Sequence, residues 1–179
     1  MIPRASVVVP TYNRGPSLER LVRQIAAQSI AREIEMVVVD NGSRSDPTPR
    51  LRALETARLA GHPEADVDDD LAEWDYGDLE GETPAALRAP SPGWPLWSGP
   101  VPGGETAEHV ATRLDRVVAR CRAASGRVLV FGHGHSLRAL AARWLDLPVA
   151  EGRYLRLDTA TVSVLGYERG TPVVQRWNS

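Results

Sequence analysis

Residues 127–140 read RVLVFGHGHSLRAL, and this stretch decides the fold class of the chain. Its apolar run, Val128–Phe131, has no polar face, which predicts a strand buried inside a parallel sheet. The strand leads directly through Gly132–Ser136 into a helix that we expect from about Leu137 to Leu145. A buried strand followed at once by a helix is the unit from which layered α/β proteins are built.

Strands and helices alternate on both sides of this unit. The apolar run Ser6–Val9 predicts another buried strand, and Thr48 followed by Pro49 is typical of a helix start. The alternation predicts an α/β fold, a three-layer Rossmann-like sandwich with a mostly parallel central sheet, in a single domain of residues 1–179. The other expected elements are helices at about 18–28, from 48 to about 60 and from 106 to about 121, and strands at 36–39, from 154 onward, at 161–167 and through 173–174.

The composition is that of a folded protein and excludes several classes of partner. Hydrophobic residues make up 42% of the 179 residues and charged residues 25%, close to the averages for globular domains. A formal net charge of −2 provides no basic field that would gather nucleic acid or an anionic membrane surface. The apolar run that ends at Pro10 is too short for a signal sequence or a membrane span, so we expect a cytoplasmic protein. The only cysteine, Cys121, lies in an apolar helical stripe, which predicts a buried thiol.

The turn after the strand Val128–Phe131 is the first candidate binding site. Ligands of open α/β sheets bind beyond the carboxyl ends of the strands, and His133 stands at that place. The amides of Gly134, His135 and Ser136 would open the following helix, where backbone N–H groups and the helix dipole favour an anion. This arrangement predicts a phosphate site. The alternative interpretation is a tight turn with one packed and one solvated histidine.

Four short motifs follow one another along the chain: TPRLRALETA at 48–57, LAEWDYGDLEG at 71–81, PGGET at 102–106 and GHG at 132–134. Each is a weak signal alone, whereas all of them in one order over roughly 130 residues form a strong one. Together they resemble the histidine phosphatase (phosphoglycerate mutase-like) superfamily, from about residue 48 to the C-terminus. The resemblance implies phosphoryl chemistry without a cofactor.

The resemblance also implies roles for individual residues. Arg52 would clamp the phosphoryl oxygens, together with His133 and the amide of Gly134. His133 would stabilise the transferring group, and Glu73 would supply a proton to the leaving oxygen. A dianionic phosphoryl group is well served by arginine and imidazole donors, and an alkoxide leaving group by a carboxylic acid. The catalytic candidates are therefore Glu73 and His133.

The chain departs from the family where the nucleophile should stand. Members of the family open with a strand that ends in Arg-His-Gly, whose histidine attacks phosphorus. Here the first strand ends in Pro10–Arg14, and no histidine precedes His62. His62 follows the helix-ending Gly61 and is expected in a surface turn, while His109 is expected on the polar side of its helix. Neither is a plausible replacement.

The opening segment has a resemblance of its own. Residues 1–47, with the strand edge Pro-Thr-Tyr-Asn and an aspartate after the second strand, are similar to the first βαβ unit of family 2 glycosyltransferases. In that family these positions, here Thr11, Asn13 and Asp40, hold the nucleotide of a sugar donor. The sequence therefore resembles a chimera of a 1–47 glycosyltransferase-like segment and a 48–179 phosphatase-like segment.

Two further patterns are weaker. Asp68–Asp70 offers an Asp-x-Asp pattern, but an acidic solvated turn is the better interpretation. His133 and His135 form a pair without a third and fourth ligand at sensible spacing, so we predict no metal. The irregular stretch from Ala89 to Gly104, with its tryptophans, is expected either to cover a ligand or to pack over the sheet edge.

These observations predict a histidine phosphatase-fold protein that binds phosphate or a phosphomonoester, with hydrolysis lost or weak. One alternative is a nucleotide-sugar-binding glycosyltransferase fragment, and another is a non-catalytic chimeric scaffold. The expected partners are a small phosphorylated molecule or free phosphate, with no nucleic acid and no membrane. A homodimer is left open.

Overall fold

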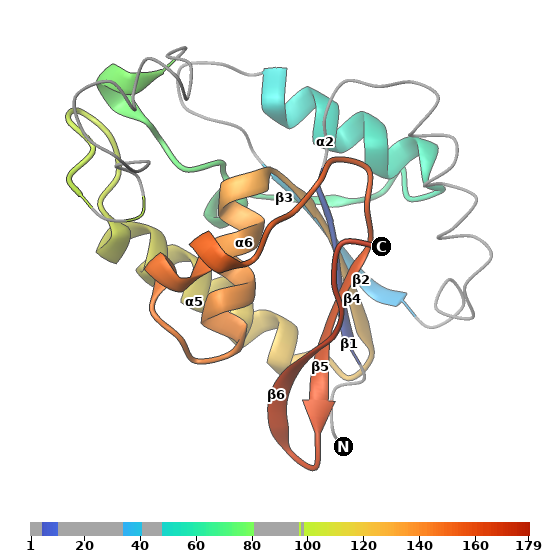
Figure 1. The fold of residues 1–179 in the computed structure, drawn as a ribbon. Coiled ribbons are helices and arrows are strands. Elements are labelled where there is room, and N and C mark those ends of the chain that lie inside the picture. The colour runs from blue at the N-terminus through green and yellow to red at the C-terminus, as the bar shows by residue number, and fades with distance from the viewer. Residues whose placement is uncertain (1–4, 11–33, 41–47, 81–96, 98) are drawn as a thin grey trace.

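The computed structural model describes residues 5–10, 34–40, 48–80, 97 and 99–179, with side chains from residue 53 onward. Its centre is a six-stranded sheet in the order β3-β2-β4-β1-β5-β6, flanked by helices (Figure 1). The predicted α/β class is confirmed. The helix expected at about 18–28 lies outside the described residues.

Strand β4 (Arg127–Gly132) lies in the interior of the sheet. It is parallel to β1 (Ala5–Pro10) on one side and to β2 (Ile34–Asp40) on the other. A short strand, β3 (Asp66–Asp68), continues the sheet parallel to β2. The first two strands are therefore separated by a strand that comes much later in the sequence, and the carboxyl ends of all of them meet at one edge.

An antiparallel hairpin completes the sheet on the other side. Strand β5 (Ser163–Glu168) pairs with β1, and β6 (Thr171–Arg176) pairs with β5, both antiparallel. Arg169 and Gly170 join them with φ values of 50° and 90°, the left-handed conformation that a two-residue hairpin turn needs.

The strand expected from Tyr154 onward is wrong. Tyr154 ends a 3-10 helix, η4 (Val149–Tyr154), and is 70% exposed. The guanidinium of Arg138 donates to the carbonyl oxygens of Gly152 and Arg153, each at 3.0 Å. Residues 155–162 then run on to β5 without strand pairing, and the Asp158 amide within them donates to the Asn178 side-chain oxygen at 2.7 Å.

Local sequence signals set the helix ends. Helix α2 (Thr48–Leu59) ends at Gly61, whose φ of 91° allows the His62 amide to donate to the Ala57 carbonyl at 2.9 Å. Helix α5 (Ala107–Ala123) is capped by the Thr106 hydroxyl, which accepts from the His109 amide at 3.2 Å. Both ends agree with the sequence prediction.

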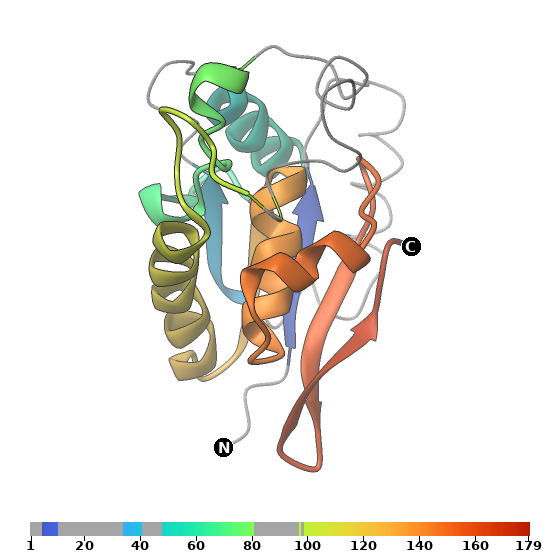
Figure 2. The ribbon, with the colours of Figure 1, turned by 60° about the vertical axis from the view of Figure 1, so that its left-hand side comes forward.

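The central strand β4 is buried on both faces. Helix α5 and helix α6 (Gly134–Trp144) pack side by side over one face, as Figures 1 and 2 show. Val128 and Val130 point into that layer and share its core, in which the Cys121 thiol is buried as predicted. Leu129 and Phe131 alternate with them and are fully buried toward the other face, where α2 contacts β2 and β4.

Candidate active site

The site lies at the edge where the parallel strands end. Pro10, the last residue of β1, pairs with Gly132, the last of β4, so the two strands end at the same level. His133 follows Gly132 directly, is buried, and is the N-cap of α6. The sequence prediction of a histidine at the start of a helix, beside the carboxyl ends of the sheet, is confirmed in its backbone geometry.

The Glu73 carboxylate occupies the N-terminus of α6. Its Oε1 accepts from the Ser136 amide at 2.7 Å and from the Trp74 amide at 2.9 Å, and its Oε2 accepts from the His135 amide at 3.3 Å. A carboxylate at this position satisfies N–H groups that have no partner within the helix and interacts favourably with the helix dipole. The expectation that the amides of His135 and Ser136 face a bound phosphate needs correction, because the Glu73 carboxylate accepts a hydrogen bond from each of them.

Gly134 lies at the start of α6 with no other described segment packed against its Cα atom. A Cβ atom built at this glycine would have no described atom within 4 Å other than those of its chain neighbours and the backbone of its own helix. Gly134 is half-buried and lies between the buried His133 and the amides that hold Glu73. Apart from its chain neighbours, no described side chain therefore fills the space next to the Gly134 Cα atom.

A buried ion pair holds the segment that carries Glu73. Arg113 on α5 binds both carboxylate oxygens of Glu105, at 2.9 and 2.8 Å. The same guanidinium donates to the carbonyl oxygens of Asp70 at 2.8 Å, Ala72 at 2.7 Å and Glu73 at 3.4 Å. A planar guanidinium with five donors can serve all of these acceptors at once. The sequence analysis did not select Arg113, although a charged residue three positions after Val110 on the buried stripe of α5 signals a buried partner.

The glycines of the PGGET motif pack against the Glu73 segment. The Glu105 amide donates to the Asp75 carbonyl at 3.0 Å, and the Asp78 amide donates to the Pro102 carbonyl at 2.8 Å. Gly77 opens a short 3-10 helix, η3 (Gly77–Leu79), and has a φ of 52°. A Cβ atom there would lie 2.2 Å from the Gly104 amide nitrogen, so this approach requires glycine.

Aromatic residues surround His135. Its Nδ1 lies 2.7 Å from the Tyr76 hydroxyl, and its ring centroid lies 5.5 Å from that of Trp97. Trp97 packs edge-on against the buried Trp74, and the Arg138 guanidinium lies 4.9 Å from its ring centroid. The sequence analysis left open whether the tryptophan loop covers a ligand. Trp97 covers His135, whereas Trp94 lies outside the described residues.

Burial also shifts the pKa values of the His135 imidazole and the Tyr76 phenol. It lowers the pKa of the His135 imidazole, with the Glu73 charge acting in the opposite direction. Burial raises the pKa of the Tyr76 phenol, and the Glu73 charge together with a hydrogen bond to Glu73 raises it further. Near neutral pH the phenol is protonated and the imidazole is uncharged.

The other predicted site residues fall into two groups. Arg52 lies on α2 and Asp40 ends β2, beside Asp68 of β3, but neither side chain is among those described. Thr11 and Asn13 lie outside the described residues, so the nucleotide-binding prediction has no structural test here.

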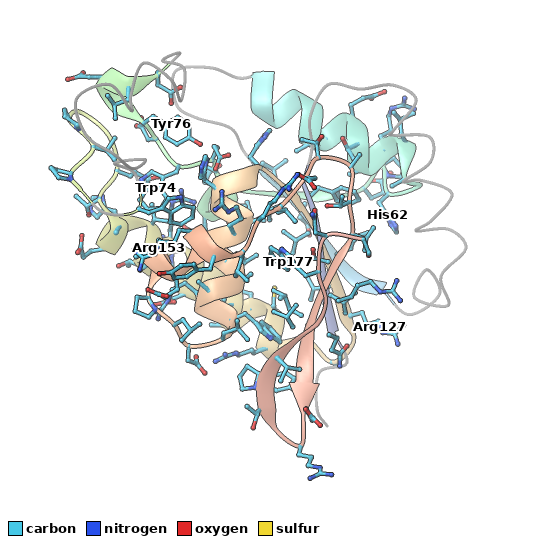
Figure 3. All side chains as sticks on the ribbon, viewed as in Figure 1. His62, Trp74, Tyr76, Arg127, Arg153 and Trp177 are labelled. Carbon is cyan, nitrogen blue, oxygen red and sulfur yellow. The ribbon has the colours of Figure 1, made fainter. Side chains whose placement is uncertain are left out.

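The remaining histidines lie away from the site. His62 is half-buried in the turn after α2, and Figure 3 shows it on the opposite side of the molecule from Trp74 and Tyr76. His109 is exposed on α5, as expected. Neither contributes to the group around Glu73 and His133.

The prediction that Asp68–Asp70 form a solvated acidic turn is wrong for Asp68 and Asp70. Asp68 and Asp70 are half-buried and pair with Arg116 and Arg120 on α5. The hydrogen bond from Arg116 is the main reason that the pKa of Asp70 is lowered. These carboxylates fasten β3 and the 3-10 helix η2 (Asp69–Leu71) to α5.

Among the described residues, no three side chains of the metal-binding types lie close enough to hold an ion.

A sequence profile of the histidine phosphatase superfamily (branch 1) matches residues 26–179. The chain belongs to the histidine phosphatase superfamily. The match begins inside the 1–47 segment that resembles a glycosyltransferase unit, so part of that segment also fits the superfamily.

Curated relatives of this histidine phosphatase chain include an acid phosphatase and a sugar bisphosphatase. It is 42% identical over 125 residues to an acid phosphatase of Mycobacterium tuberculosis, covering 69% of this chain and 62% of the relative. It is 34% identical over 149 residues to sedoheptulose 1,7-bisphosphatase of Saccharomyces cerevisiae, covering 68% of this chain and 55% of the relative. The chain thus spans less than two thirds of either relative.

Solved structures share this fold, and their superpositions cover nearly all of the chain. The product of an open reading frame of Mycobacterium tuberculosis superimposes with a TM-score of 0.81 at 29% identity, covering 98% of this chain and 97% of the other. A mycobacterial glucosyl-3-phosphoglycerate phosphatase, solved in complex with VO3, gives a TM-score of 0.76 at 23% identity, covering 98% of this chain and 99% of the other.

In the part of the chain that the structure describes, no helix has the length and apolarity of a membrane span.

Proposed function

We propose that this member of the superfamily binds phosphate or a phosphomonoester at the carboxyl edge of β4, and that its hydrolytic turnover is weak. His133 and the Gly134 amide would bind the phosphoryl group, with Arg52 as the clamping arginine. Glu73 would face the leaving oxygen. The observation that carries the proposal is the Glu73 carboxylate, fixed by two amides of α6 directly after His133 and Gly134.

The chemistry of the relatives supports the class of ligand. Both the acid phosphatase and the sedoheptulose 1,7-bisphosphatase are phosphatases by name. The glucosyl-3-phosphoglycerate phosphatase has been solved with VO3 and with inorganic phosphate. Phosphate and vanadate are therefore the first probes to use with this chain.

The expectation of weak turnover rests on the missing histidine. A histidine that attacks phosphorus would have to follow β1, but that strand is followed by Thr11, Tyr12 and Asn13. Loss of a covalent nucleophile from a group of residues that act together can cost on the order of 10⁶ in rate. What remains is binding and electrostatic stabilisation of the phosphoryl group.

Thermal unfolding with phosphate and vanadate tests the binding. A ligand at 100 times its Kd stabilises the folded state by about 2.7 kcal/mol, which is roughly 5–10 °C for a chain of this size. We expect this shift in the wild-type protein and its loss in the Arg52→Ala/His133→Ala double variant. The matched control is Arg58→Ala/His109→Ala, which removes an exposed arginine of α2 and an exposed histidine of α5. Absence of any shift in the wild-type protein would favour the non-catalytic scaffold instead.

Restoring a histidine tests the explanation for weak turnover. Thr11 is the first residue after β1, as His133 is the first after β4, and the two strands end in register. If a missing nucleophile limits the rate, Thr11→His should raise p-nitrophenyl phosphate hydrolysis above the wild-type level, and adding His133→Ala should abolish the gain. Fast wild-type hydrolysis would show that the missing histidine does not limit the reaction.

The nucleotide-sugar alternative remains a prediction from the sequence. It requires uridine nucleotide binding that Asp40→Ala abolishes, and no binding at millimolar nucleotide would remove it. The chimeric origin of the chain, its cytoplasmic location and a homodimer likewise remain predictions.

A further inference from the structure

We propose that Trp97 is a positioning residue, whose ring holds together the two segments whose backbone amides bind the Glu73 carboxylate. The role of Glu73 as the group that faces the leaving oxygen rests on the proposed function. The placement of the carboxylate itself can be measured without any ligand.

Three amides hold the Glu73 carboxylate, and they come from two separate segments. The Trp74 amide belongs to the segment that carries Glu73, whereas the amides of His135 and Ser136 lie in the first turn of α6. Glu73 and His135 are 62 positions apart in the sequence, so only tertiary contacts can set the spacing of the two segments. The carboxylate can bind both segments only while that spacing is kept.

The Trp97 ring contacts a side chain from each of these segments. Its centroid lies 5.5 Å from that of Trp74, in an edge-on arrangement with an interplanar angle of 82°. It lies 5.5 Å from that of His135, with the rings tilted at 52°. Aromatic pairs at these distances attract each other beyond the effect of the area that they bury. Because the amides of Trp74 and His135 both bind Glu73, the Trp97 ring connects the two segments that hold the carboxylate.

The Trp97 ring is itself fixed in place. It is buried, and the Arg138 guanidinium lies 4.9 Å from its centroid while donating to the carbonyl oxygens of Gly152 and Arg153. A Cβ atom at Gly152 would lie 2.7 Å from Trp97 Cζ3 and 2.8 Å from Cη2, so the ring lies directly against the backbone of η4. A large, rigid side chain held in this way leaves the two segments little freedom to move apart.

The consequence concerns the placement of one flexible side chain. A glutamate has several rotatable side-chain bonds, and ordering it costs free energy that its hydrogen bonds must offset. If the two segments separated, the carboxylate could keep the Trp74 amide or the amides of α6, but not all of them. A catalytic group that is misplaced by about 1 Å can lose on the order of a hundredfold in rate. Trp97 thus keeps the Glu73 carboxylate at the start of α6, directly after His133 and Gly134.

Hydrogen exchange at two neighbouring amides separates this role from a general loss of structure. The Ser136 amide lies in the first turn of α6, where amides have no acceptor within the helix, and it donates to Glu73. The Leu137 amide, one residue later, donates to the His133 carbonyl at 3.0 Å and does not need Glu73. Both residues are fully buried. The Glu73→Ala variant gives the rate of Ser136 exchange without the carboxylate.

We expect Trp97→Ala to speed Ser136 exchange toward the rate in Glu73→Ala, by about tenfold to a hundredfold, the range for an amide that loses a charged acceptor. The Leu137 rate should stay near its wild-type value. Trp97→Phe keeps an aromatic ring and should retain most of the protection of Ser136. The matched control, Trp177→Ala, removes a half-buried tryptophan of the C-terminal segment and should leave both rates unchanged.

Gly152→Ala displaces the same ring without deleting it. The new Cβ atom would approach Trp97 Cζ3 and Cη2 too closely, so Ser136 exchange should rise as it does in Trp97→Ala. Phenylalanine lacks these two atoms. The Gly152→Ala/Trp97→Phe double variant should therefore recover the protection of Ser136, which it would not do if Gly152→Ala acted by unfolding η4.

The inference is overturned if Ser136 exchanges at the wild-type rate in Trp97→Ala, or in Gly152→Ala should Trp97→Ala not fold, when Glu73→Ala has raised that rate. It is also overturned if Ser136 and Leu137 lose protection together, because Trp97 would then only stabilise α6, or if wild-type Ser136 exchanges as fast as in Glu73→Ala. Phosphate-induced stabilisation is measured separately on the same proteins. A wild-type protein that fails to bind phosphate refutes the proposed function and leaves the exchange test intact.

Discussion

Replacing Arg113 by alanine should be among the most damaging substitutions outside the apolar core. The guanidinium is buried and makes two bonds to Glu105 and three to backbone carbonyl oxygens. Removing one partner of a buried ion pair typically costs about 3–5 kcal/mol, because the other charge is left without compensation. The Glu105 side chain is 23% exposed, so water can reach it and reduce that cost, while the three carbonyl groups add to it.

We therefore expect a loss of about 3–4 kcal/mol in the free energy of unfolding, equivalent to a fall of about 10 °C in Tm. Urea unfolding followed by tryptophan fluorescence measures it, and the indole of Trp74, which donates to the Glu105 carbonyl at 3.0 Å, lies beside the change. The matched control is Arg116→Ala, which removes an arginine from the same helix whose side chain is 55% exposed in its ion pair with Asp70. This control should cost about 1 kcal/mol or less.

The comparison between the two arginines can refute the reasoning. If Arg113→Ala costs no more than Arg116→Ala, then burial of the Arg113–Glu105 pair does not decide its energetic weight. The LAEWDYG segment would then be held by its apolar contacts, chiefly Leu71 and Trp74, which are both fully buried.

Three further predictions test separate features of the chain. Burial depresses the pKa of His135 below its ordinary 6.5, so the unfolded chain binds this proton first and wild-type stability falls as pH drops below about 6.5. Urea unfolding at several pH values should show a smaller fall in stability for His135→Asn than for the wild-type protein. Equal dependence of stability on pH in the two proteins would contradict this. Gly77→Ala should lower the free energy of unfolding by about 3 kcal/mol or more, because its Cβ atom would lie 2.2 Å from a backbone nitrogen. Gly170→Ala is the control: its φ is 90°, but a Cβ atom there meets no other described segment within 4 Å, so the loss should be only about 1–2 kcal/mol. Thermal melts measure both. Thr106→Ala should cost about 1 kcal/mol by removing the cap of α5, and Thr106→Ser should recover most of it.

The sequence by itself determined the central strands, two of the helix ends and the sheet edge at which the candidate site lies. Continuous apolar runs located β1, β2 and β4, and the stripe from Val110 to Cys121 located the buried face of α5. Turn and cap residues set the ends at Gly61 and Thr106. These features are local, because burial repeats with the period of a strand or a helix and leaves its record in neighbouring residues.

Only the tertiary structure decided which groups meet at that edge. Periodicity cannot show that the amides of His135 and Ser136 bind Glu73, which lies about sixty positions earlier, or that Arg113 is buried against Glu105. The three-residue strand β3 was missed, since so short a segment has no period and forms by pairing with β2. The physical reason is common to all three: a polar group finds its partner through the closure of long loops, and the free energy that selects the partner depends on burial that exists only after the chain has folded.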